Sequence, residues 1–120
     1  YTDPTSGKPT FKNFYPGSIT ASDIVAQVYD DPKIVYEVQC DGTLAQASVG
    51  ANADTTSMTA GSTVTGKSSG EISATTASGT AQLRIIGISR DPDNNDQASN
   101  NTNAYVLINE HAYSQTTGTK

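Results

Sequence analysis

The chain has 120 residues, 34% of them hydrophobic and 16% charged, and its seven basic and twelve acidic residues give a net charge of −5. This length predicts a single domain with one small core. With only two arginines, the chain lacks the basic clusters that bind nucleic acids or anionic membranes, and no apolar run approaches the roughly 20 residues of a membrane span. We therefore expect neither a nucleic-acid partner nor a membrane partner.

The residue types favour β-structure over helices. Thr and Ser occupy 17 and 13 positions, 30 of 120 together, whereas Leu, Met and Glu are scarce. Hydroxyl residues favour strands and turns, and the scarce residues are those that build helices. We predict an all-β fold, a single small antiparallel β-sandwich or barrel with an extended N-terminal arm and long polar loops.

Residues 1–22 are predicted to form this arm, and residues 23–120 the single β-domain. Three prolines interrupt the arm, and proline fixes φ and removes a backbone donor, so an extended path is expected rather than a helix. Its aromatic side chains either cover the core of their own domain or dock on a neighbouring subunit. The candidate partner-binding residues are Tyr1, Phe11, Phe14 and Tyr15.

A hairpin is predicted over residues 24–40. Residues 34–40 alternate between apolar and polar side chains, the period-2 pattern of a half-buried strand that ends on the single cysteine, Cys40. The turn residues Asp30 to Lys33 separate this strand from the apolar segment 24–29. Cys40 itself is expected to be a buried small hydrophobic residue rather than a reactive thiol.

Residues 55–80 are rich in Ser, Thr and Gly and offer few apolar anchors. Disorder is one interpretation; we favour two weak strands at 55–59 and 70–75, with the tip 61–70 projecting. Residues 61–68 match the phosphate-loop pattern G-x-x-x-x-G-K-[ST], but neither a buried strand before them nor a helix after them is expected, which argues against a nucleotide site.

Two further strands are predicted at 82–89 and 104–113, with an exposed polar loop at 90–103 between them. In this loop Asp91, Asp93 and Asp96 are candidate calcium ligands, because hard cations take oxygen donors. The alternative is a solvated turn in which these side chains bond to their own backbone. Asn100 begins a glycosylation sequon, which has meaning only in a secretory pathway.

No catalytic constellation is recognised, so no enzyme activity and no cofactor are expected. His111 is the single histidine, too few for the usual zinc site, and no nucleophile elbow accompanies it as the base of a serine nucleophile. We interpret His111 as a structural residue in or beside the sheet.

Short pieces along nearly the whole chain resemble one family. They are Tyr1-Thr2-Asp3-Pro4, Phe14-Tyr15-Pro16, Asp23-Ile24-Val25-Ala26, Asp30-Asp31-Pro32, Gln39-Cys40-Asp41-Gly42, Gly50-Ala51-Asn52-Ala53-Asp54, Gly61-Ser62-Thr63 and Ile108-Asn109-Glu110-His111-Ala112-Tyr113. In these pieces the chain resembles small virion proteins of marine tailed bacteriophages. Members of that family continue upstream of Tyr1, so the resemblance implies a trimmed portion of a longer chain.

The resemblance implies a capsid decoration or stabilisation role without enzyme activity. The expected partners are the major capsid protein, further copies of the chain, or both, and the expected location is the virion surface. Two alternatives stay open. One is an extracellular β fibre or adhesin subunit whose arm acts as a donor strand, and the other is a carbohydrate-binding β-sandwich.

Overall fold

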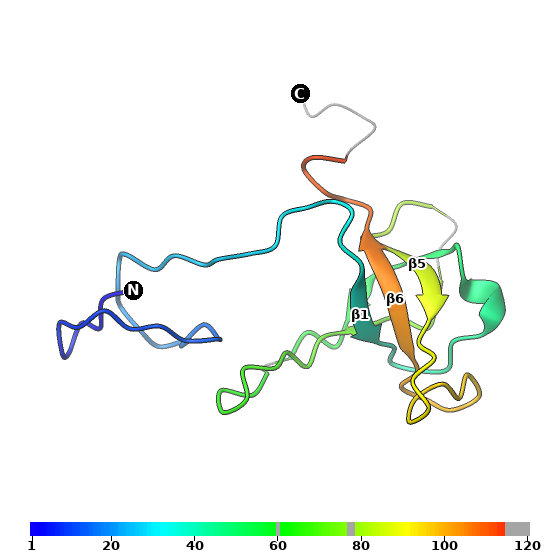
Figure 1. Cartoon of the computed structure of the whole chain (residues 1–120), viewed down its shortest axis with the longest axis horizontal. Coiled ribbons are helices and arrows are strands. Elements are labelled where there is room, and N and C mark those ends of the chain that lie inside the picture. Colours follow the sequence, from blue (N-terminus) through cyan, green and yellow to red (C-terminus); the bar gives the residue numbers. More distant parts are fainter. Residues whose placement is uncertain (60, 77–78, 115–120) are drawn as a thin grey trace.

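The computed structural model describes residues 1–59, 61–76 and 79–114. Within them lie six strands and one short 3-10 helix (Figure 1). In chain order these are β1 (Tyr36–Gln39), η1 (Gln46–Ser48), β2 (Asn52–Ala53), β3 (Thr55–Thr56), β4 (Glu71–Ile72), β5 (Leu83–Ile88) and β6 (Asn103–Ile108). The all-β prediction is confirmed.

Four strands form the main sheet in the order β1-β6-β5-β2, and every neighbouring pair is antiparallel. The two longest strands, β5 and β6, lie in the centre of this sheet. Their register shifts between Ile85 and Gly87, which leaves Ile86 as a bulge. Strand β1 lies at one edge, so the alternating segment of the sequence pairs with the C-terminal strand.

Strands β3 and β4 form a separate two-stranded antiparallel sheet. The chain passes from one sheet to the other at Asp54, whose carboxylate accepts the N–H of Gln82 and whose carbonyl accepts the N–H of Ser73. One parallel bridge, between Cys40 and Ile72, brings β4 against the end of β1. This single bridge does not close the described strands into a barrel.

The buried core takes side chains from strands of both sheets and from Leu44, which lies in the segment after β1. Alternate positions of β6 and β5 are buried, as a strand with one face inward requires. The bulge changes which side of β5 faces inward, so Ile85 and Ile88 are both buried. The buried cluster consists of Cys40, Leu44, Ala53, Ile72, Ile85, Ile88, Ala104 and Val106.

The predicted 24–40 hairpin is wrong. Its second half is a strand, with Tyr36 and Val38 half-buried and Cys40 fully buried, but residues 24–29 are not a strand and pair with nothing in the described structure. The physical reason is that the chain turns at residues 31–34, where Ile34 donates its N–H to the Asp31 carbonyl, so residues 24–29 lead away from β1 (Figure 1).

Residues 55–80 contain two paired strands, β3 and β4, which are shorter than the predicted strands at 55–59 and 70–75; residues 60, 77 and 78 lie outside the described structure. Strands β3 and β4 pair, and the segment between them projects from the body (Figure 1). At the tip, Ser62 donates its N–H to the Lys67 carbonyl (2.9 Å). The segment that follows the phosphate-loop pattern is strand β4 rather than a helix.

The remaining strand predictions are confirmed in their apolar parts. Strand β5 covers most of 82–89, whereas β6 ends at Ile108, so residues 109–113 lie outside it. The pairing continues by one bond, from Asn109 N to the Gln82 carbonyl, and then stops. Strand β2 and η1 were not predicted, because two or three residues without alternation give no pattern to detect.

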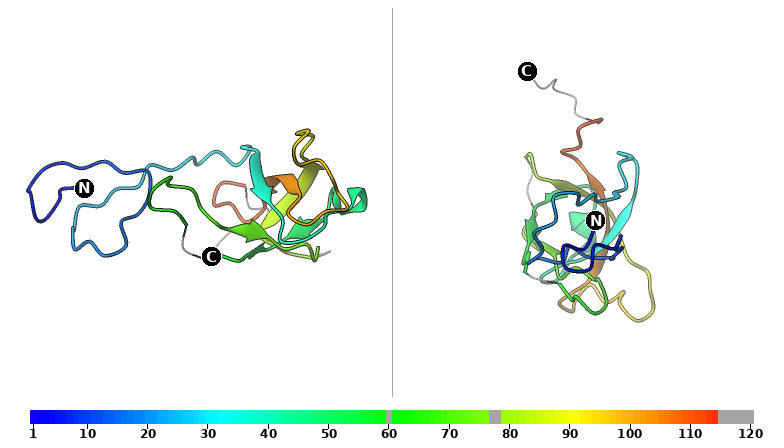
Figure 2. Two further views of the ribbon diagram at one scale, coloured as in Figure 1. Left: turned by 90° about the horizontal axis from the view of Figure 1, so that it is seen from below. Right: turned by 90° about the vertical axis from the view of Figure 1, so that its left-hand side faces the viewer.

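The whole molecule is elongated and thin, with principal extents of 53 × 41 × 20 Å. Its sheets occupy one end, and the N-terminal residues extend away from them (Figures 1 and 2). The part that leaves the body is residues 1–33, which is longer than the arm predicted from the prolines. We call residues 1–33 the arm.

Candidate functional site

The first ten residues of the arm close on themselves. Asp3 donates its N–H to the Lys8 carbonyl (2.9 Å), and Thr10 donates to the Tyr1 carbonyl (2.8 Å). Gly7, with φ +67°, supplies the left-handed conformation that the turn needs. The arm therefore begins with a small loop rather than a fully extended strand.

Two carboxylates hold this loop. Asp3 Oδ1 accepts the N–H groups of Ser6 and Thr5, which lower the pKa of Asp3. Asp23 accepts the N–H of Thr2 at 2.9 Å, and hydrogen bonding by the side chain and backbone of Thr2 lowers the pKa of Asp23. Both carboxylates are thus favoured in their charged form. The bond from Thr2 to Asp23 also brings the two ends of the segment 2–23 together.

The apolar side chains of the arm are mostly exposed. Phe11 is 92% exposed and Tyr15 66%, while Tyr1 and Phe14 are half-buried within the arm itself. None of them belongs to the core cluster or to the side chains packed against it. The interpretation that the arm aromatics cover the core of their own domain is therefore wrong.

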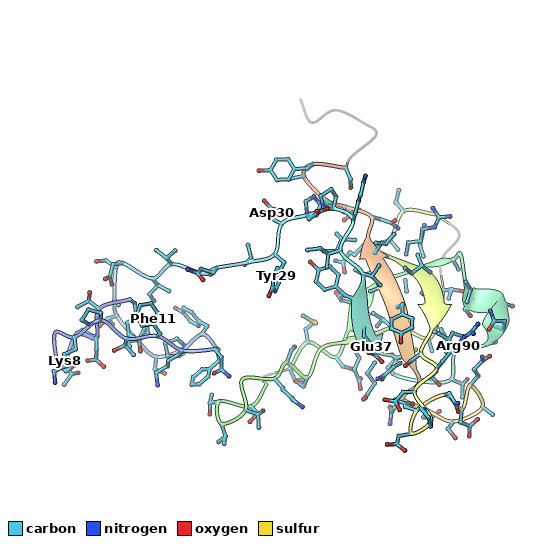
Figure 3. All side chains as sticks on the ribbon, in the orientation of Figure 1. Lys8, Phe11, Tyr29, Asp30, Glu37 and Arg90 are labelled. Carbon is cyan, nitrogen blue, oxygen red and sulfur yellow. The ribbon has the colours of Figure 1, made fainter. Side chains whose placement is uncertain are left out.

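Most of residues 24–29, further along the arm, are also exposed. Val25 is 80% exposed, Val28 77% and Tyr29 85%. Tyr1 and residues 10–16 and 24–27 line a shallow hollow of about 550 Å³. Phe11 lies in the arm, away from the sheets (Figure 3). Sequence reasoning placed residues 24–29 in a hairpin, so it missed their exposure; their apolar character was the signal, but it fits a buried strand equally well.

Two contacts tie the arm to the body. Asn13 Nδ2 donates to the Thr65 carbonyl at the tip of the β3–β4 hairpin (3.1 Å). Gly66, with φ +70°, lies beside the Asn13 side chain, where a Cβ would collide with it. At the other end of the arm, His111 Nε2 lies 3.3 Å from Asp30 Oδ1.

His111 is almost fully buried beyond the end of β6, and both of its ring nitrogens have partners. Besides Asp30, the ring contacts the Tyr113 backbone, whose N–H donates to Nδ1 (3.1 Å). This geometry gives His111 a structural task, which is to fix the point where the arm leaves the body. Cys40 is fully buried, and burial raises the pKa of its thiol.

The calcium candidates Asp91, Asp93 and Asp96 lie in the exposed 90–103 loop. Asp91 Oδ1 accepts the Asp93 N–H (3.1 Å), and Asp96 Oδ2 accepts the Ser99 hydroxyl (2.7 Å), which lowers the pKa of Asp96. No group of three or more His, Cys, Asp or Glu side chains suited to a metal ion occurs in the described part of the chain. Such local hydrogen bonds to the carboxylates are what the solvated-turn alternative predicts.

Comparison with known proteins gives no relative. No family model, no curated protein and no solved structure matches the chain. Within residues 1–59, 61–76 and 79–114, no helix has the length and apolarity needed to cross a membrane. Functional inference therefore starts from the arm and the sheet.

Proposed function

We propose that this protein is a non-enzymatic structural subunit of a tailed-phage virion, which decorates or stabilises the capsid by binding the lattice of the major capsid protein. The observation that carries the proposal is the arm, which presents apolar side chains far from the core of its own domain. The resemblance to small virion proteins supplies the choice of capsid as partner. The body that carries the arm is best classed as a small β-sandwich, its two sheets enclosing one core.

Exposed apolar side chains on an extended segment are suited to binding another protein. Phe11 and Tyr15 are large, and aromatic side chains that become buried dominate interface energetics. Binding of the native state to a partner also adds to stability in proportion to the logarithm of partner concentration. A domain with a core as small as this one gains from such a partner.

The shape of the molecule supports a position on a shell. Its shortest extent is 20 Å against a longest of 53 Å, so the domain can lie flat while the arm reaches a neighbouring subunit. A net charge of −5 and two arginines favour a protein surface over nucleic acid as the partner.

One observation favours a second candidate, an extracellular β fibre or adhesin subunit. The exposed segment 24–29 has the composition of a strand and pairs with nothing in the described structure. In a fibre, such a segment would be the donor strand passed to the next copy.

Electron microscopy of native particles separates the two candidates. Regular copies on an icosahedral shell support decoration, whereas an open helical polymer of the chain would reject it. A binding assay then tests the arm: we expect Phe11→Ser with Tyr15→Ser to weaken binding to shells that lack the protein at least tenfold. The matched control is Met58→Ser with Val64→Ser, which removes exposed apolar side chains from the β3–β4 hairpin and should bind normally.

A further inference from the structure

One edge of β1 is open over most of its length. The bond from Cys40 N to the Thr102 carbonyl (2.9 Å) sets the antiparallel alternation, so Tyr36 and Val38 direct their backbone groups to β6. Val35 and Glu37 direct theirs to the opposite side, where the described chain provides no backbone partner. Strand β4 covers this edge only at its end, by the bridge at Cys40.

A strand that fits this edge exists in the same chain. Residues 24–29 are uncharged, and β-branched and aromatic residues of the kind that favour strands make up most of them. Three of these side chains are at least 77% exposed in the free molecule. The sequence pattern predicts that residues 24–29 pair with residues 34–40. In the described structure residues 24–29 pair with no strand, and the edge of β1 that would receive them is open.

The segment is held away from its own β1. Asp30 is tied to His111, which follows β6, the strand on the closed side of β1. Next along the chain, Lys33 donates its N–H to Asp31 Oδ1 (2.8 Å) and Ile34 donates to the Asp31 carbonyl, which forms a turn. In Figure 1 β1 is the left-hand strand of its sheet, and the arm leaves from its upper end rather than folding down along its open edge.

We propose that residues 24–29 of one copy add as a strand to the open edge of β1 in a second copy. Exchange of an identical element between copies is a common route to oligomers, because each copy supplies both the donor and the acceptor. Strand addition satisfies the outward backbone groups of Val35 and Glu37 and protects an exposed edge. The inference rests on the donor-strand role of residues 24–29 in the second candidate function and adds the acceptor, the open edge of β1; it needs no capsid partner.

The apolar pattern fixes the register of the added strand. Antiparallel pairing of Val28 with Tyr36 places Ala26 opposite Val38, so that Val28 and Ala26 lie on the core side of the sheet. A shift of one residue would put Gln27 there instead, which is why this register is preferred.

On the outer side, the same register places Tyr29 opposite Val35, an aromatic and β-branched cross-strand pair. Tyr29 is 85% exposed and Val35 50% exposed in the free molecule, so the pairing removes both from contact with water. Gln27 then lies opposite Glu37, both on the solvent side.

Disulfide trapping tests the exchange on the full chain. One variant carries Gln27→Cys and a second, differently tagged, carries Glu37→Cys, so a disulfide between the two engineered positions joins two chains. Directly opposite residues lie about 5.5 Å apart between Cα atoms, within the range a disulfide spans. Cys40 stays in place, because its buried thiol is inert and leaves the core unchanged.

We expect the mixed disulfide to form at least tenfold more than in a control mixture of Gln27→Cys with Asn95→Cys, an exposed position in the 90–103 loop. Equal yields in both mixtures would overturn the proposal. So would a chain carrying both Gln27→Cys and Glu37→Cys that closes on itself and stays monomeric, because residues 24–29 would then occupy their own edge.

A second measurement needs no engineered cysteine. The unmodified chain should form oligomers in sedimentation experiments as its concentration rises, and Val28→Asp should raise the concentration required at least tenfold. Val64→Asp is the matched control, since Val64 is 91% exposed on the hairpin tip and lies outside the proposed contact. An unmodified chain that stays monomeric overturns strand exchange, while its binding to capsid shells, measured separately, reports on the proposed function.

Discussion

The body of the molecule and its arm hold their shapes by different interactions. In the body, eight buried apolar residues from the strands and the segments beside them form one core. In the arm, short hydrogen bonds to Asp3 and Asp23 shape a loop, while Phe11, Val25 and Tyr29 remain in water. The arm is therefore organised, but Phe11, Val25 and Tyr29 are not part of the core of the body.

The largest loss of stability is expected for a substitution in the buried core of the body. Ile85 is fully buried in β5, so Ile85→Ala leaves a cavity and should lower the free energy of unfolding by about 2–5 kcal/mol. Denaturant unfolding followed by circular dichroism measures this. Val64→Ala, at an exposed site, should change it by less than about 0.5 kcal/mol. Similar losses for both variants would contradict a core that includes Ile85.

A smaller effect is expected at Thr102, which anchors the 90–103 loop to the body. Its buried hydroxyl lies within bonding distance of the carbonyls of Asp96 (3.2 Å) and Ser99 (3.1 Å). Thr102→Val keeps the shape but removes the donor, so a loss of about 1–3 kcal/mol in unfolding free energy is expected. Thr102→Ser keeps the hydroxyl and should recover part of it. A fully stable Thr102→Val chain would show that this bond contributes nothing.

The sequence predicts strand β1 but not the strand that pairs with it. Period-2 alternation identified residues 34–40 because one face is buried and the other is not. It did not identify the partner, since segments 24–29 and 104–108 are both strand-like and only tertiary packing selects between them. In the structure β1 pairs with residues 103–108, which also pair with β5 and so complete the sheet.

The candidate site was predicted only in part. The prolines and aromatics indicated an extended arm with Phe11 and Tyr15 as anchors, and both are exposed. The end of the arm was misplaced, because the bond from His111 to Asp30 joins residues 81 positions apart and leaves no local pattern. The calcium hypothesis for Asp91, Asp93 and Asp96 came from composition, which cannot distinguish a metal loop from turns that bond to their own backbone.

Acid should loosen the arm while the paired strands of the body keep their shape. The pKa values of Asp3 and Asp23 are lowered in the folded chain, so their contribution is complete above the ordinary aspartate pKa of about 4. It is lost as pH falls through the lowered folded values. We expect the amide resonances of Ser6 and Thr2 to move in this window while those of β5 and β6 stay fixed.

The variant Asp3→Asn tests whether Asp3 causes the pH-dependent movement of the Ser6 amide. Asp3→Asn removes the titrating carboxylate, so the pH-dependent movement of the Ser6 amide should disappear while Thr2 still responds through Asp23. If the strands of the body titrated together with the arm, the separation of the two regions would be contradicted.

Removal of residues 1–16 shows whether the arm serves the stability of its own domain or the binding of a partner, because both quantities are measured on the same truncated chain. The account predicts a melting temperature within about 3 °C of the full chain, since no core residue is lost, together with at least tenfold weaker binding to capsid shells. A truncated chain that loses its melting transition, or that binds shells as well as the full chain, would contradict it.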